Sequence, residues 1–239
     1  SIIEGIFKSK LKIKKIYISP RNKLISNKIS KRFKKVTVEI NNQQVIDRSN
    51  WVFLAVTPQV GSKILNKLKF NKNKKIISLI STINLEKLKK YTKNKNISRV
   101  IPLPFIGMRK GPIIICPKNN QLKNFFKHLG KVIELKNEKT SKAFWSTSSF
   151  MASFYFLLNQ TSNWLTSKGI KRKDAENYTR ELFLALSEDA INKNKISLKQ
   201  LVLESQTPGG TNAYVLNQLK KKKFYKVQQT VLNSIFKKF

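Results

Sequence analysis

The chain has 239 residues, which is long enough for one large domain or for two modest ones with separate cores. A hydrophobic fraction of 40% excludes a disordered chain, which would be poor in large apolar residues. Lysine and arginine outnumber the acidic residues by 49 to 12, and the formal charge of +37 means that a polyanionic partner has to be considered.

The first two thirds of the chain alternate between short β-branched runs and segments of helical spacing. This pattern is typical of a parallel sheet with crossover helices. The expected strands are Ile16 to Ile18, Val36 to Ile40, Trp51 to Val56, Ile76 to Ile80, Val100 to Ile101, Ile113 to Ile115 and Val132 to Leu135. The expected helices are Asn22 to Arg32, Gln59 to Leu68, Leu85 to Tyr91 and Gln121 to Leu129. Their order predicts a doubly wound α/β domain over residues 1–138.

The alternation stops after about residue 138, so residues 139–239 are expected to form an all-α domain. The expected helices are Lys142 to Ser167, Lys173 to Asn192, Leu198 to Glu204, Thr211 to Lys221 and Val227 to Phe236. The segment from Phe144 to Trp164 is apolar or small on almost every side, and such a helix must be buried. Since one monomer has little to cover it, we expect a homodimer or a higher homo-oligomer.

Two residue types that often carry chemistry occur once each. Cys116 ends an apolar run, so a buried strand thiol is expected, and the lack of a disulfide partner favours the reducing cytoplasm. His128 has no second His or Cys at ligand spacing, so no metal site is expected. No apolar run reaches the roughly 20 residues of a membrane helix, so no membrane partner is expected.

The positive charge is spread along the chain. Lysines alternate with Asn and Ile in segments such as Asn71 to Lys75, Tyr91 to Asn96 and Ile191 to Ile196. This spread favours a solvated surface under a compositional bias over a selected polyanion site. A catalytically inactive basic protein that binds nucleic acid through this surface is the alternative.

A dinucleotide site requires a glycine-rich turn between the first strand and the first helix. The chain contains no GxGxxG, yet Ser1 to Lys10 has the pattern of the helix after such a turn. We therefore expect the first strand and its glycine loop to be missing from the N-terminus, and the chain to be inactive without them. The end of the next strand, at Ser19, Arg21 and Asn22, has a cation and no carboxylate, which suits the 2′-phosphate of NADP (NADPH). A basic surface turn is the alternative.

Four segments resemble pyrroline-5-carboxylate reductases in their order and approximate spacing. They are Ser1 to Lys10, Trp51 to Gln59, Arg99 to Pro102 and Thr207 to Thr211. The Ala-Val-Thr-Pro-Gln and Thr-Pro-Gly-Gly-Thr pieces together are fairly specific, and the likeness covers essentially the whole chain. The resemblance implies an NAD(P)-binding domain followed by a helical domain through which dimers interlock.

The resemblance also implies roles for single residues. Those on the nicotinamide-ribose side would be Ala55, Val56, Thr57 and Pro58. Those at the substrate carboxylate would be Gly209, Gly210, Thr211 and Asn212. Asn212 would be catalytic, because it replaces a hydroxyl that usually hydrogen-bonds the substrate nitrogen. Two glycines before a helix can also leave backbone N–H groups open to an anion. A buried strand ending in a Pro turn, and a plain interhelical turn, are the alternatives.

Three departures from the family surround the expected substrate. The family usually has Lys at the place of Thr57, Asn at the place of Leu103, and Gly-Ser-Gly-Pro-Ala-Tyr at the place of Ser148 to Ser153. The resemblance thus implies reduction of a cyclic imino acid by NADPH, with 1-pyrroline-5-carboxylate to L-proline as the leading case. A related imine reductase with another substrate is the alternative.

Overall fold

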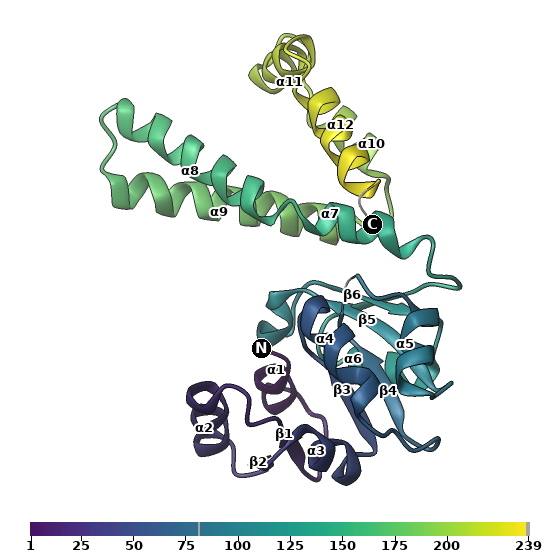
Figure 1. Cartoon of the computed structure of the whole chain (residues 1–239). Helices are drawn as coiled ribbons and strands as arrows, with labels where there is room; N and C mark the ends of the chain where they lie inside the picture. Colours follow the sequence, from purple (N-terminus) through teal and green to yellow (C-terminus); the bar gives the residue numbers. More distant parts are fainter. Residues whose placement is uncertain (81, 238–239) are drawn as a thin grey trace. The chain divides into compact units, whose positions relative to one another are not determined.

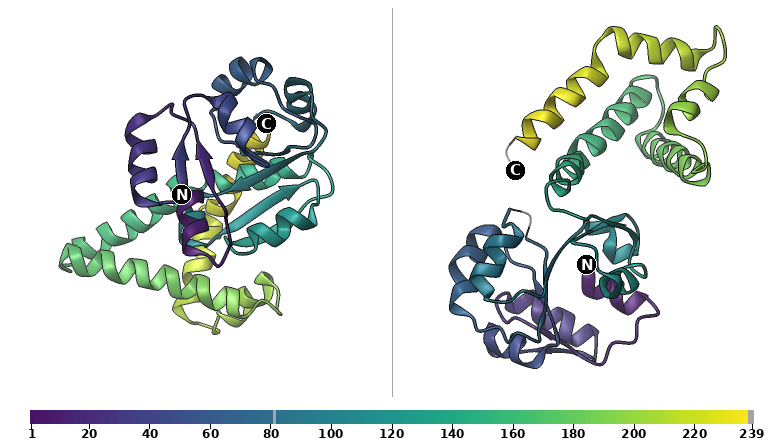
Figure 2. Two further views of the ribbon diagram at one scale, coloured as in Figure 1. Left: turned by 90° about the horizontal axis from the view of Figure 1, so that it is seen from below. Right: turned by 90° about the vertical axis from the view of Figure 1, so that its right-hand side faces the viewer.

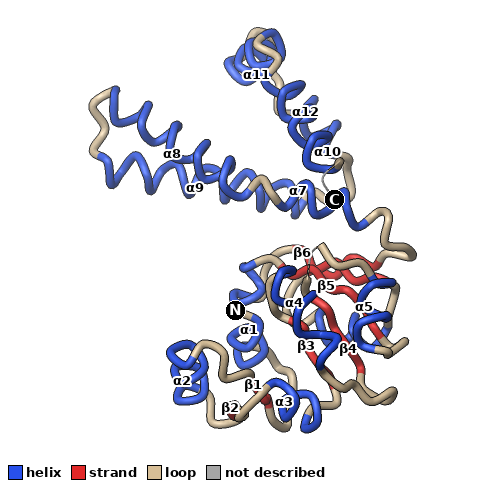
Figure 3. Tube along the Cα trace, in the orientation of Figure 1, coloured by secondary structure: helices blue, strands red, loops and turns tan. Residues whose placement is uncertain are grey.

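The structure is a computed structural model that describes residues 1–80 and 82–237 (Figure 1). The chain divides into two compact units, Ser1–Trp145 and Ser146–Phe239. Within the described residues, the strands belong to the first unit and the second unit is helical (Figure 3). The predicted order of an α/β domain and an all-α domain is therefore confirmed, while the exact boundary at residue 138 stays a prediction.

The strands of the first unit form two sheets. They are β1 (Ile16–Ile18), β2 (Val36–Val38), β3 (Trp51–Leu54), β4 (Lys75–Ser78), β5 (Ile97–Pro102), β6 (Pro112–Cys116) and β7 (Lys131–Glu134). The strands β1 and β2 pair in parallel, and β3 to β7 form a second sheet in chain order. Only β5 and β6 are antiparallel among the described pairs. The residues between β5 and β6 are too few for a parallel crossover, which takes about a dozen or more.

Helices and short 3₁₀ turns connect the strands. They are α1 (Ile2–Lys8), α2 (Lys23–Arg32), α3 (Asn42–Arg48), α4 (Pro58–Ile64), η1 (Leu65–Lys67), α5 (Leu85–Thr92), η2 (Pro104–Met108) and α6 (Asn120–Phe126). The sequence pattern did not predict α3, because this helix is too short to show more than one turn of apolar periodicity. The sequence nevertheless contains a signal for the start of α3. Asn41 is its N-cap residue, and the Asn41 side chain accepts a hydrogen bond from the N–H of Gln44. Asn22, Asn84 and Asn119 cap α2, α5 and α6 in the same way.

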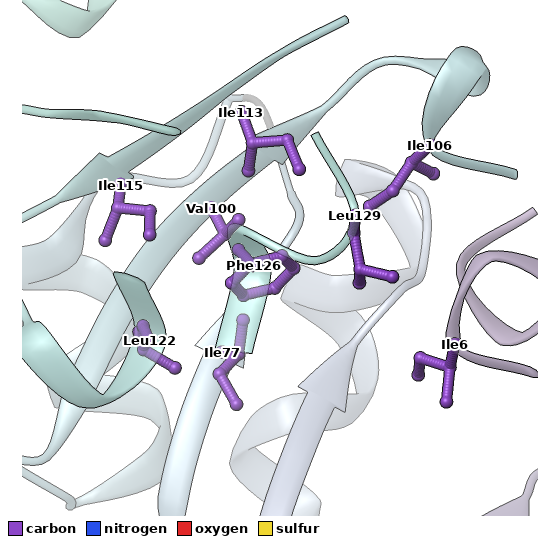
Figure 4. Packing of buried hydrophobic residues seen from close by; sticks show 9 residues of the cluster. All are labelled: Ile6, Ile77, Val100, Ile106, Ile113, Ile115, Leu122, Phe126 and Leu129. Carbon is purple, nitrogen blue, oxygen red and sulfur yellow. The ribbon is translucent and has the colours of Figure 1, made fainter. Parts of the chain in front are cut away.

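The larger sheet is covered on both faces, as a doubly wound fold requires. Neighbouring residues of β4 enter opposite cores, because side chains alternate along a strand. Ile77 packs with Val100 and Phe126 under α6 (Figure 4), whereas Ile76 packs with Leu88 of α5. All of these side chains are fully buried. The near-continuous apolar runs of β4 and β6 follow from this two-sided burial.

Helix α1 packs against the η2 turn with no room for a side chain between the two backbones. A Cβ atom on Gly5 would lie 2.3 Å from the carbonyl oxygen of Ile106, which is closer than real atoms approach. Both residues are buried. A glycine is therefore required at this position of the helix, although glycine is otherwise a poor helix former.

Replacing Gly5 with Ala should lower the melting temperature of the protein by roughly 2–12 °C, because overpacking against fixed backbone costs about 1–3 kcal/mol. Thermal unfolding followed by circular dichroism measures the change. Gly61→Ala is the matched control, since its Cβ would meet only methyl groups, those of Ile80, Ile83 and Val56 at 3.1, 3.2 and 3.5 Å, and methyl groups can move. An unchanged or higher melting temperature for Gly5→Ala would contradict this packing.

The helices of the remaining chain are α7 (Ser141–Ser148), α8 (Met151–Ser167), α9 (Arg172–Asn192), α10 (Leu198–Glu204), α11 (Thr211–Lys221) and α12 (Phe224–Phe236). The sequence predicted one helix from Lys142 to Ser167, but the helix is interrupted after Ser148. There the carbonyl of Ser146 accepts both the backbone N–H and the hydroxyl of Ser149. A serine side chain that competes with the backbone in this way disfavours a continuous helix.

The second unit has almost no core of its own. Helices α8 and α9 lie side by side (Figure 2), and small residues line their contact: Ser162, Ala175 and Thr179 are at most 2% exposed. Ala175 is the one apolar side chain that is fully buried in the described part of this unit. Many large side chains of the predicted apolar segment stay open, with Phe154 43% and Trp164 60% exposed, although Trp145 is buried in the first unit. One chain therefore leaves this segment uncovered.

Candidate functional site

A groove of about 1360 Å³ opens between the two sheets of the first unit. Its walls include β1 and β3, whose facing edges pair with no other strand among residues 1–80 and 82–237. Apolar side chains line it, including Ile2, Ile6, Ile16, Trp51 and Phe53. In a doubly wound sheet of order 3-2-1-4-5-6, this is the place of strand 1. The expectation of a missing first strand stays a prediction, and this groove is where such a strand would lie.

The carboxyl ends of β1 and β3 open into the same groove. Ser19 and Arg21 line it after β1, and Ala55 and Val56 line it after β3. Ligands of open α/β sheets bind at this edge. The hydroxyl oxygen of Ser19 accepts the backbone N–H of Arg21 at 3.3 Å, and the Arg21 side chain is exposed. Four of the predicted cofactor residues are thus brought together, with a guanidinium and no carboxylate in the turn.

Three predicted cofactor residues do not line the groove. Asn22 accepts the N–H of Ile25 at 3.1 Å and so acts as the cap of α2. Thr57 is exposed at the N-cap position of α4, and its side chain makes no cap hydrogen bond. Pro58 is the first residue of that helix, where its missing N–H costs nothing. Helix initiation accounts for Asn22 and Pro58 without a ligand.

A further arginine of the groove, Arg48, has no signal in the sequence. The guanidinium of Arg48 lies 4.5 Å from the ring centre of Tyr17 and forms a 2.9 Å ion pair with Glu39. Glu39 is only 6% exposed, so the pair neutralises a nearly buried carboxylate next to β1. No spacing in the sequence connects these residues, because the contact depends on how α3 folds back.

Arg99 is a buried charge inside β5, and in the sequence it is visible only as part of the segment Arg99 to Pro102 that carries the resemblance. Its side chain is 3% exposed and pairs with Glu138, and its guanidinium lies 3.9 Å from the ring centre of Trp145. Burial lowers the pKa of Arg99, while the hydrogen bond and charge of Glu138 act in the opposite direction. A lone arginine within the apolar run Ile97–Pro102 was the available signal, because a buried charge requires a partner.

Cys116 lies opposite Arg99 in the β5–β6 pairing and is 1% exposed. Burial, followed by the charge of Glu138, raises the pKa of its thiol above the ordinary value. A protonated, buried thiol is a poor nucleophile. The prediction of a buried strand thiol is confirmed.

Neither metal-binding clusters nor spanning helices were found in the part of the chain that the structure describes. No group of three or more His, Cys, Asp or Glu side chains there could hold a metal ion. No helix of the same residues is long and apolar enough to cross a membrane.

The predicted carboxylate site is a turn between α10 and α11. The N–H of Gly210 donates to the carbonyl of Thr207 at 2.8 Å, and Gly209 has φ = +74°. With Pro208 before it, this is the arrangement of a type II turn. The N–H of Gly210 is therefore used inside the turn, which corrects the expectation that both glycines are open. The open donors are the first N–H groups of α11, at Thr211, Asn212 and Ala213.

Asn212 supports the same turn. Its side-chain Nδ2 donates to the carbonyl of Ser205 at 3.2 Å, so one N–H of this amide contacts protein, and the catalytic role of Asn212 stays a prediction. The glycine turn belongs to the second unit, whereas the groove belongs to the first. The predicted site residues thus fall into two sets, one in each unit.

Two family models match the chain. Residues 138–239 match the pyrroline-5-carboxylate reductase dimerisation family, and residues 1–84 match the family described as NADP oxidoreductase, coenzyme F420-dependent. Solved reductases of this kind match the fold of nearly the whole chain. The family named for pyrroline-5-carboxylate reductase dimerisation thus matches the C-terminal part of the chain, and the fold of the whole chain is like that of these reductases. No curated protein matches the sequence at a significant level.

Three solved structures illustrate the likeness of fold, and two of them are reductases of this kind. 1-Pyrroline-5-carboxylate reductase from Streptococcus pyogenes is 18% identical, with a TM-score of 0.83 over 99% of this chain and 92% of that chain. The Plasmodium falciparum enzyme, crystallised with NADP, is 20% identical, with a TM-score of 0.81 over 99% of this chain and 91% of that one. An Aspergillus terreus reductive aminase in complex with NADPH and ethyl levulinate is 12% identical, with a TM-score of 0.60 over 100% and 94%. At these identities the likeness is one of fold.

Proposed function

We propose that the protein reduces the C=N bond of a cyclic imino acid with NADPH, with 1-pyrroline-5-carboxylate as substrate and L-proline as product. The observation that carries this proposal is that Ser19, Arg21, Ala55 and Val56 come together at the carboxyl ends of β1 and β3, in a chain whose residues 138–239 match the reductase dimerisation family. The Ser19-to-Arg21 turn offers a cation and no carboxylate. The family model over residues 1–84 is described as an NADP oxidoreductase, which supports the same cofactor.

The residues of the groove fit two parts of NADP. Arg21 suits the 2′-phosphate, since a guanidinium binds phosphate through charge-assisted hydrogen bonds. Ala55 and Val56 are small and apolar enough for the nicotinamide ribose to lie against them. The described residues include no glycine-rich turn for the pyrophosphate. When bound, the cofactor supplies the hydride, and the protein's own part is to bind, orient and exclude water.

The cofactor assignment predicts a preference for NADPH over NADH. Arg21→Ala should lower kcat/KM for NADPH by about tenfold to a hundredfold and leave NADH unchanged, because a charged hydrogen bond contributes about 1.5–3 kcal/mol. Steady-state kinetics of the protein expressed from its complete coding sequence measure both values. Lys23→Ala is the control, since this exposed cation two residues away does not line the groove. Equal kcat/KM for the two cofactors in the unmodified protein would refute the assignment.

The active species is proposed to be a homodimer or a larger homo-oligomer. The family model that matches residues 138–239 is named for dimerisation. The exposed aromatic side chains of α8, including Phe154, Tyr155 and Trp164, form the kind of apolar surface that a second copy of the chain would cover.

The nucleic-acid alternative is less well supported by the first unit. The exposed cations include Lys31 of α2, Lys89 of α5 and Lys123 of α6, so the positive charge is not confined to one element. A selected polyanion site would gather cations on one face. If the complete protein reduced neither 1-pyrroline-5-carboxylate nor a six-membered cyclic imino acid, but bound DNA or RNA with steep salt dependence, the reductase proposal would be replaced by this one.

A further inference from the structure

Arg99 and Glu138 tie together the two ends of the segment that leaves β4. The carbonyl of Ile80 accepts a hydrogen bond from Nη2 of Arg99 at 3.1 Å. The N–H of Leu85, the first residue of α5, donates to both carboxylate oxygens of Glu138, at 3.1 and 3.0 Å. The two side chains also pair with each other. The ion pair therefore connects Ile80, near the start of the segment, with Leu85 at its end.

The same segment packs against residues that line the groove. Ile80 and Ile83 are 2% and 6% exposed. A Cβ atom on Gly61 of α4 would lie 3.1 and 3.2 Å from their Cδ1 atoms and 3.5 Å from Cγ2 of Val56. Both side chains thus pack against α4 next to Val56. Leu79, at the start of the segment, lines the groove itself.

We propose that Arg99 and Glu138 are positioning residues for the dinucleotide. They hold residues 79–80 and 82–85, and through Ile80 and Ile83 they hold α4 and Val56 in the geometry that receives the nicotinamide side. This inference rests on the proposed function. An apolar pair could fill the same space, but it would leave the Ile80 carbonyl and the Leu85 N–H without their charged partners. Directional bonds to both backbone groups are what the ion pair adds.

Glu138→Gln tests the proposal in the protein expressed from its complete coding sequence. Glutamine keeps the size of the side chain and can still accept from Leu85, but it removes the charge opposite Arg99. Amide hydrogen exchange in residues 82–90 should become at least about tenfold faster, while exchange in α6 stays unchanged. The Kd for NADPH, measured by fluorescence titration, should rise at least about tenfold, because a small displacement of a binding wall is costly. The KM for the imino acid at saturating NADPH should change less than about threefold.

Glu134→Gln is the matched control. Glu134 has the same local arrangement, since Oε1 accepts the N–H of Asn119 before α6 at 3.1 Å and Oε2 pairs with Lys123 at 3.0 Å. It ends β7 and does not line the groove. Its replacement should lower the melting temperature and leave the Kd for NADPH unchanged. A purely structural role of Glu138 would produce that same result.

The possible results distinguish failure of the positioning role from failure of the proposed function. If Glu138→Gln lowers the melting temperature but leaves the Kd for NADPH unchanged, the positioning role is refuted. If the unmodified protein does not bind NADPH, the proposed function fails, and the exchange measurement still decides whether the pair holds the segment. Unchanged exchange in residues 82–90 would refute that as well. Should Glu138→Gln not fold, Glu138→Asp keeps the charge on a shorter side chain, and about threefold changes in exchange and Kd are expected.

Discussion

Replacing Phe154 with Asp should dissociate the proposed homodimer into monomers. The Phe154 ring is 43% exposed in one chain and touches Phe183 of α9 edge-on, at 6.1 Å between ring centres. A carboxylate placed at a buried apolar contact loses its hydration, which costs several kcal/mol, and a two-fold interface contains the change twice. The dimer dissociation constant should rise at least about a hundredfold, since each 1.4 kcal/mol corresponds to tenfold.

Sedimentation velocity over a range of protein concentrations measures this change. Asn159→Asp is the matched control, because it adds the same charge at an exposed polar position of α8. The control should leave the dimer intact. A concentration-independent monomer in the unmodified protein would contradict the proposed oligomer and would leave the exposed apolar side chains of α8 unexplained.

The second large effect is expected at the turn before α11. If the first N–H groups of α11 bind the substrate carboxylate, the protein should act on 1-pyrroline-5-carboxylate and hardly at all on the imine that lacks the carboxylate. Two hydrogen bonds to a charged group contribute about 3–6 kcal/mol, so kcat/KM should differ by at least about a hundredfold. NADPH oxidation followed by absorbance measures both rates. Equal rates with the two imines would refute the carboxylate site.

Substitutions in the turn sharpen this test. Gly210→Val should raise KM for the imino acid by at least about tenfold, because a Cβ there already lies 3.0 Å from the Thr207 carbonyl and a branched side chain would crowd the open N–H groups. Gly209→Ala should act through its backbone, since φ = +74° costs an L-residue about 1–2 kcal/mol. Gly169 is the matched control: it has φ = +88°, and its Cβ would likewise meet nothing within 4 Å. Gly169→Ala should lose similar stability without raising KM.

Much of the fold could be predicted from local pattern. The helices Leu198–Glu204 and Thr211–Lys221 and the strand Ile16–Ile18 have the predicted bounds, because apolar periodicity and β-branched runs report local structure directly. The interruption after Ser148 and the short helix α3 were missed, since a break or a single turn carries too few residues to show a period. The reversed direction of β6 was missed because no residue type encodes the direction of pairing.

The candidate site divides in a similar way. A lone cation at Arg21 and a Pro-Gly-Gly turn at Gly209 are visible in a sequence because their chemistry is local. The pairing of Arg99 with Glu138 joins residues 39 positions apart, and that of Arg48 with Glu39 depends on the course of α3. Such contacts cannot be read from spacing.

The sequence by itself determined that an α/β domain precedes a helical one, and that the turn after β1 bears a cation and no carboxylate. Both are properties of neighbouring residues, which fix hydrophobic period and local charge. Only the tertiary structure decided that β1 and β3 face each other across an apolar groove. It also decided that the N–H of Gly210 donates within its own turn, and that a buried ion pair connects the two ends of the segment after β4. These depend on which distant segments meet, and that is set by the packing of the whole core.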